Sequence, residues 1–117
     1  MMVVQCVRQI VPNGCPSEPA RRLDLVVGKK YRVITVEGND YRLLGESDGP
    51  YLYPAMAFTI IDDAWDDDWM GEEDAEEGTC IGPPSLLSPG LWEDYFDRDP
   101  MIRSMVDEVL RIKGVRN

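Results

Sequence analysis

The sequence predicts a small, mainly β domain of the α+β class, namely a short-stranded β-barrel with an acidic helix or loop insertion and a C-terminal α-helix. Three observations support this fold class. Turn residues recur about every ten residues between positions 23 and 61. Residues 62–78 are densely acidic, and residues 99–113 have apolar side chains at helical spacing. A chain of 117 residues accommodates one modest core, so we expect a single domain over residues 1–117.

The barrel is expected within residues 3–61. Strands are predicted over residues 31–36, 41–44 and 51–53, where β-branched and aromatic residues gather. Turns are predicted at residues 38–40 and 46–49, which contain Gly, Asn, Asp and Ser. Residues 2–10 would form a further strand that pairs back onto this meander.

The same region resembles a known family. The pattern consists of Leu25, Gly28, Lys29, Tyr31 and Val33, then Tyr41, Leu43 and Asp48-Gly49, then Tyr51-Leu52-Tyr53-Pro54 and Phe58. It is similar to the small bacterial and phage SH3-like domains, in which a short 3-10 turn with a proline and an aromatic residue follows the strand after the distal hairpin. The resemblance implies an SH3-like barrel with such a turn within residues 53–58. It implies a fold and leaves the function open.

Eukaryotic SH3 domains bind proline-rich peptides in an aromatic groove. The resemblance therefore implies Tyr51, Tyr53, Pro54 and Phe58 as a peptide groove. This chain departs from the family pattern, because it lacks the ALYDY element and has Tyr41-Arg42 in place of the groove tryptophan.

The charge of the chain is strongly polarised. Residues 1–42 contain seven Lys/Arg and four Asp/Glu, residues 43–97 contain fifteen Asp/Glu and no Lys/Arg, and residues 98–117 contain five Lys/Arg and three Asp/Glu. Such an acidic segment repels phosphate, so direct nucleic-acid binding is disfavoured. A basic protein surface, including one on a nucleic-acid-binding protein, would be attracted to the segment.

Two tryptophans lie within the densely acidic residues 62–78, and Ile61 lies just before these residues. Ile61, Trp65 and Trp69 are four residues apart and would share one face of a helix. Two alternatives stay open: the three side chains dock on the barrel, or the tryptophans are exposed anchors within an acidic rim. In the second case the predicted partner-binding residues are Trp65, Trp69, Asp66, Asp67, Asp68, Glu72 and Glu73.

The last third of the chain is predicted to contain a loop and a helix. Residues 79–98 are expected to form a loop without regular structure, because Gly and Pro are frequent between residues 78 and 92. A helix is predicted over residues 99–113, with Asp99 as N-cap, Pro100 at the first helical position and Gly114 at its end. Its apolar face either packs on the barrel or serves as a dimer face or a Met-rich recognition surface.

Catalytic chemistry has little support. The chain has no histidine, which removes the commonest general base and metal ligand near neutral pH. Cys6, Cys15 and Cys80 form no CxxC motif. Acids from Asp66 onward follow the spacing of a calcium loop, but Met70 takes the position of a ligand. We expect no enzyme activity, no metal and no cofactor.

The leading functional hypothesis is a small acidic inhibitor, either an immunity protein or a phage-encoded inhibitor of a host or defence factor. The alternative is a structural or accessory module of a phage or secretion assembly, and a third is a peptide-binding adaptor. No leader or membrane span is recognised, so the expected compartment is the cytoplasm of a bacterium or a phage-infected cell. The sequence leaves the oligomeric state open.

Overall fold

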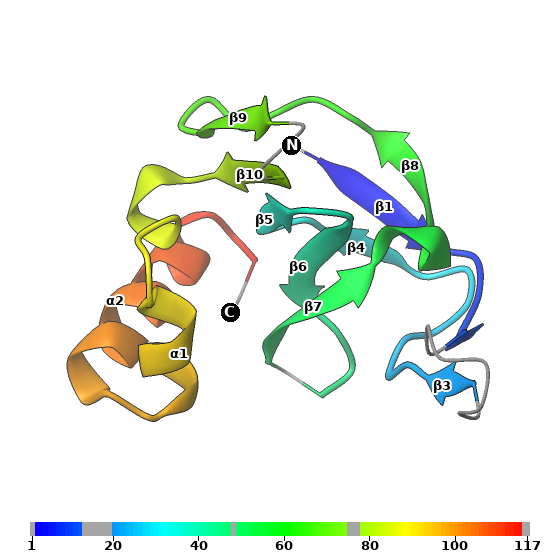
Figure 1. The fold of residues 1–117 in the computed structure, drawn as a ribbon, viewed down its shortest axis with the longest axis horizontal. Coiled ribbons are helices and arrows are strands. Elements are labelled where there is room, and N and C mark those ends of the chain that lie inside the picture. Colours follow the sequence, from blue (N-terminus) through cyan, green and yellow to red (C-terminus); the bar gives the residue numbers. More distant parts are fainter. Residues whose placement is uncertain (1, 13–19, 48, 75–77, 116–117) are drawn as a thin grey trace.

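The strands of the protein are short and form three antiparallel sheets (Figure 1). The computed structural model describes residues 2–12, 20–47, 49–74 and 78–115, and of residues 72–74 and 78 only the backbone. The strands in these ranges are β1 (Val3–Cys6), β2 (Ile10–Val11), β3 (Arg21–Arg22), β4 (Lys30–Arg32), β5 (Thr35–Glu37), β6 (Asp40–Leu44), β7 (Pro50–Pro54), β8 (Phe58–Asp62), β9 (Met70–Asp74) and β10 (Gly78–Gly82).

The strand order confirms a mainly β fold. One sheet has the order β4-β1-β8, a second has the order β7-β6-β5-β10-β9, and β2 pairs with β3. The described strands do not close into a barrel, because β4 and β8 are the edges of the first sheet and β7 and β9 are the edges of the second. The three-stranded and five-stranded sheets enclose the larger core, which includes Val4, Tyr31, Leu43, Tyr53 and Trp69.

The strand predicted over residues 31–36 is divided between the two larger sheets. β4 pairs with β1, and β5 pairs with β6 and β10. Between these strands, Val33 packs in the larger core and Ile34 packs in a second core beside the helices. Successive side chains of an extended chain point to opposite faces, so these two consecutive apolar residues are buried in different cores.

Two turns of this region were predicted correctly, one from its turn residues and one from the resemblance. The β5–β6 hairpin closes at Gly38 and Asn39, with Glu37 opposite Asp40. Gly38 has a φ of 63°, a conformation that glycine adopts readily. A 3-10 turn, η1 (Ala55–Ala57), follows β7, within the segment where the resemblance placed it.

Residues 79–98 contain regular structure, so the prediction of an irregular loop was wrong. Gly78 to Gly82 form β10, and the chain continues through η2 (Pro84–Leu86) into α1 (Leu91–Phe96). Glycine here permits close packing of strands, since a Cβ on Gly82 would lie 2.7 Å from Thr35 Cγ2. A Cβ on Gly71 of β9 would collide with the carbonyl oxygen of Cys80.

The C-terminal helix is confirmed as α2 (Pro100–Ile112). The Asp99 carboxylate accepts hydrogen bonds from the amides of Met101 and Ile102, which satisfies two free donors of the first turn. At the other end Val115 N donates to Leu110 O, and Gly114 N donates to Arg111 O, with Gly114 at a φ of 76°. These two bonds define a Schellman motif.

The two helices lie together beside the second sheet (Figure 1). Val106 and Leu110 of α2 are fully buried against Trp92 and Tyr95 of α1 and against Ile34. Each such side chain stabilises the fold by roughly 1.5–3 kcal/mol. The apolar face of α2 therefore packs inside the molecule, as one of the two alternatives expected. No described helix is long and apolar enough to cross a membrane.

Candidate functional site

The acidic segment begins with a loop and continues as a strand. Residues 63–69 are not helical, and β9 starts at Met70 (Figure 1). The helix expected from the spacing of Ile61, Trp65 and Trp69 is therefore absent. Mutual repulsion of the five carboxylates within residues 62–68 disfavours a helix, and the chain instead makes a turn at residues 66–69, in which Trp69 N donates to Asp66 O at 3.0 Å. We call residues 62–68, which are the last residue of β8 and the segment after it, the acidic loop.

The two tryptophans of the segment have different environments. Trp69 is 6% exposed and belongs to the larger core. Trp65 is 47% exposed. Of the three side chains expected to dock, Trp69 alone is buried in the core, because Ile61 is also 47% exposed. Trp65 is an exposed aromatic residue among acidic residues, and its role as a binding anchor stays a prediction.

Asp66 anchors the acidic loop. Its carboxylate accepts a hydrogen bond from Arg32 Nη2 at 3.0 Å and pairs with Lys113 Nζ at 3.0 Å. Burial alone would raise the pKa of Asp66, but the hydrogen bonds from Lys113 and Arg32 outweigh burial and hold the pKa below its ordinary value. Arg32 also donates to the carbonyl oxygen of Lys113. These bonds tie together β4, the acidic loop and the end of α2.

The remaining predicted contact residues differ in how far the structure describes them. Asp67 is exposed, together with its neighbours Asp62 and Asp63. Asp68 is half exposed and accepts a hydrogen bond from Lys113 Nζ at 2.6 Å. Glu72 and Glu73 lie on β9, and their side chains are outside the described part of the structure. The exposed residues of the acidic loop are thus Asp62, Asp63, Ala64, Trp65, Asp67 and Asp68.

Two of the four residues of the predicted peptide groove, Tyr51 and Tyr53, line one depression of about 340 Å³ together with Asp24. Tyr53 is 3% exposed, and its hydroxyl donates to Asp24 at 2.6 Å. Phe58 packs edge-on against Tyr31 and Tyr41 at the margin of the larger core. Tyr51 is exposed and stacks on Phe96 of α1, with ring centroids 5.2 Å apart. Pro54 ends β7 and is half-buried.

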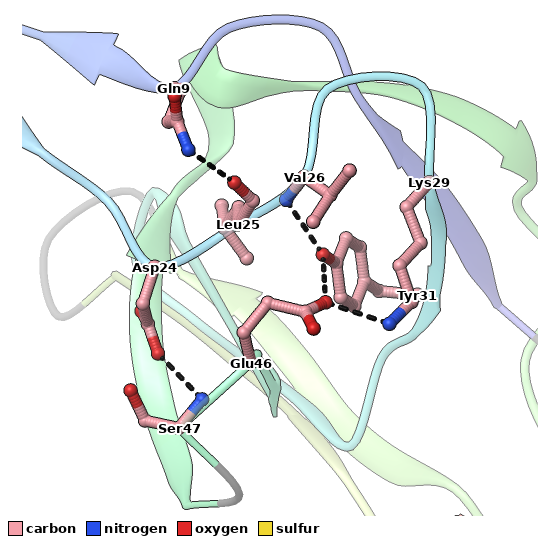
Figure 2. Close-up of polar contacts among 8 residues, drawn as sticks. All are labelled: Gln9, Asp24, Leu25, Val26, Lys29, Tyr31, Glu46 and Ser47. Atoms are coloured by element: carbon pink, nitrogen blue, oxygen red, sulfur yellow. Dashed lines mark hydrogen bonds and ion pairs between the residues drawn. The ribbon is translucent and has the colours of Figure 1, made fainter.

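A polar cluster near β4 fixes the loop that precedes this strand (Figure 2). The Tyr31 hydroxyl accepts a hydrogen bond from Val26 N at 2.9 Å and donates to Glu46 at 2.8 Å. Lys29 pairs with the same carboxylate at 2.7 Å. Burial and the neighbouring Glu46 carboxylate raise the pKa of Tyr31 to about 12, so this hydroxyl remains protonated and serves as a structural clamp.

Two of the three cysteines lie in the described part of the chain. Cys6 is buried, and burial raises the pKa of its thiol. Cys80 is exposed on β10, and Cys15 lies outside the described residues. In the described part of the chain, no three His, Cys, Asp or Glu side chains converge as metal ligands would.

A second charged group, which the sequence analysis missed, lies between the second sheet and α1. Arg42 donates through Nε and Nη2 to both oxygens of Glu37, at 2.7 and 3.1 Å, and through Nη1 to Pro50 O. Its guanidinium stacks on Trp92 at 4.1 Å. Thr35 donates a further hydrogen bond to Glu37. The predicted hairpin was a usable signal for this ion pair, because Glu37 and Arg42 are diagonal neighbours across β5 and β6.

The Arg42–Glu37 pair adjoins a cleft of about 200 Å³. The opposite wall of the cleft is formed by η2, by the loop after it and by the first residues of α1. The acidic loop and this cleft are the two candidate sites for recognition of another molecule. No family model, curated protein or solved structure matches the chain, so both sites are interpreted from their geometry alone.

Proposed function

We propose that this protein is a small acidic inhibitor that binds a basic surface of another protein through its acidic loop. Immunity proteins and phage-encoded inhibitors of host factors are the classes that we consider. The observation that carries the proposal is the exposed Trp65 on a loop that is anchored directly after this residue. The Asp66 ion pairs hold the loop to β4 and α2, and Trp69 fixes its end in the core.

This arrangement suits protein recognition for physical reasons. Tryptophan is the residue type most enriched at binding hot spots, and an anchored loop loses little conformational entropy when it binds. Asp62, Asp63 and Asp67 surround Trp65 in the sequence and are exposed. They would increase the association rate with a basic partner, and if this partner binds nucleic acid, the carboxylates would take the place of phosphates.

We also propose that the scaffold is SH3-like. Two features support this proposal: β5, β6 and β7 form a meander in one sheet while β1 and β8 pair in another, and the 3-10 turn η1 separates β7 from β8. The addition of β9 and β10 to the edge of β5 explains why the second sheet has five strands.

One observation favours the alternative of a structural or accessory module. Met101 at the start of α2 is 81% exposed and Ile112 at its end is 70% exposed, so apolar side chains of this helix remain available for contact. Under this alternative the acidic loop contributes only solubility.

Capture of partners from a lysate of the source organism separates the two proposals. The test variant carries Trp65→Ala and Asp67→Lys and keeps Trp69, whose removal would damage the core. The matched control carries Met101→Ala and Glu108→Lys on α2, with the same change in net charge. If the protein is such an inhibitor, the wild type and the control both capture one basic protein, and higher salt reduces this capture. The test variant does not capture it. Equal capture by the test variant at both salt concentrations would refute the inhibitor proposal.

A further inference from the structure

The cleft beside Arg42 has the size of one side chain. Its volume of about 200 Å³ lies below the roughly 300–1,000 Å³ of sites that bind whole small molecules. Leu87, Leu91 and Trp92 contribute its apolar wall, and Glu37, Arg42 and Glu93 contribute its charged groups.

The charges that face solvent in this cleft are negative. Within the ion pair, the Arg42 side chain is 6% exposed and the Glu37 side chain is 26% exposed, so the carboxylate is the more accessible partner. Glu93, which also lines the cleft, is exposed. The more accessible charges of the cleft are therefore carboxylates.

The Glu37 carboxylate is ionised and has remaining capacity to accept hydrogen bonds. Burial raises its pKa, but hydrogen bonds from Arg42 and Thr35 outweigh burial and lower the pKa below the ordinary value. Oε2 accepts from Arg42 Nε and from Thr35, and Oε1 accepts from Arg42 Nη2. A carboxylate has about four lone-pair positions, so one position on Oε1 remains for a further donor.

From this geometry we infer that the cleft binds a cationic side chain, lysine or arginine, of the protein partner. The ammonium or guanidinium group pairs with Glu37 and Glu93, and the methylene stem packs on Leu87 and Leu91. Long basic side chains combine an apolar stem with a charged head, which matches an apolar wall with accessible carboxylates. The inference rests on the proposed function, because it makes the cleft a second contact for the same basic partner.

The test requires no partner. N-acetyl-arginine amide and N-acetyl-lysine amide are titrated into the ¹⁵N-labelled protein, and the amide signals of Leu87 and Leu91 and the indole signal of Trp92 are followed by NMR. Saturable shifts confined to these signals are expected with at least one of the two cations. N-acetyl-citrulline amide, which has the shape of the arginine derivative without its charge, is expected to produce none.

Two variants with the same change in charge serve as the test and its control. Glu93→Gln is expected to weaken binding about threefold, within the range for an exposed carboxylate, and Glu108→Gln on the exposed side of α2 is expected to leave it unchanged. Equal shifts with the citrulline derivative, absence of saturable shifts, or the same affinity in the Glu93 variant would each overturn the inference. These outcomes are independent of partner capture through Trp65, so failure of the cleft and failure of the proposed function are distinguishable.

Discussion

Replacement of Asp66 by Asn tests whether the acidic loop is anchored by charge. Asn removes the carboxylate and retains nearly the same shape. The Asp66 side chain is 9% exposed, and its partners Lys113 and Arg32 are 13% and 25% exposed. Removal of one partner from a fully buried ion pair costs about 3–5 kcal/mol, whereas an exposed pair contributes about 0.2–1 kcal/mol.

The structure places the expected loss between these limits. After the substitution Lys113 retains Asp68 and Arg32 retains the carbonyl oxygen of Lys113, so neither cation is left without an acceptor. We therefore expect the free energy of unfolding to fall by about 2–3 kcal/mol. Urea denaturation followed by tryptophan fluorescence measures this change. Asp67→Asn is the matched control, since it removes the same charge from an exposed position and should alter stability by less than about 0.5 kcal/mol.

The same pair of variants has a defined pH dependence. Because the pKa of Asp66 is lowered in the folded state, its contribution is complete above the ordinary carboxyl pKa of about 3.9 and is lost as the pH falls through the folded value. The stability difference between wild type and Asp66→Asn should be constant from about pH 5 to 7 and shrink below pH 4. Equal stability of the Asp66 and Asp67 variants at neutral pH would refute the anchored loop.

Three further predictions follow from burial, ionisation and capping. Trp69→Ala should lower the free energy of unfolding by about 3–5 kcal/mol and Trp65→Ala by less than about 1 kcal/mol, as measured by urea denaturation; similar losses would contradict their different burial. Tyr31→Phe should remove a tyrosinate absorbance step near pH 12, and an unchanged titration curve would argue against the bonded Tyr31 hydroxyl. In the wild type, the free energy of unfolding should decline as the pH rises from about 10 toward 12. Asp99→Ala should destabilise the protein by about 1 kcal/mol while Asp97→Ala does not, and equal effects would count against Asp99 as the N-cap.

Local signals in the sequence predicted local structure well. Asp99, Pro100 and Gly114 delimit α2 because capping depends on residues within one turn of the helix end. Gly38 and Asn39 predicted the β5–β6 hairpin for the same reason. The mainly β class followed from the repeated turns and the β-branched residues between them.

The features that the sequence did not predict depend on distant contacts. Glycines near Gly82 suggested a loop, but in the fold glycine allows β10 to lie against β5. The helical spacing of Trp65 and Trp69 carried no information about the core that buries only one of them. The pairing of Asp66 with Arg32 and Lys113 joins residues far apart in the chain, and no local pattern predicts it.

Site-specific photo-cross-linking tests whether the acidic loop or α2 is the interaction surface. A benzophenone amino acid is placed at position 65 on the acidic loop or at position 101 on α2, and the full-length protein is irradiated in a lysate of the source organism at low and high salt. We predict a cross-link to one basic protein from position 65, reduced at high salt, and none from position 101. A cross-link from position 101 alone, insensitive to salt, would contradict this prediction and would make α2 the interaction surface.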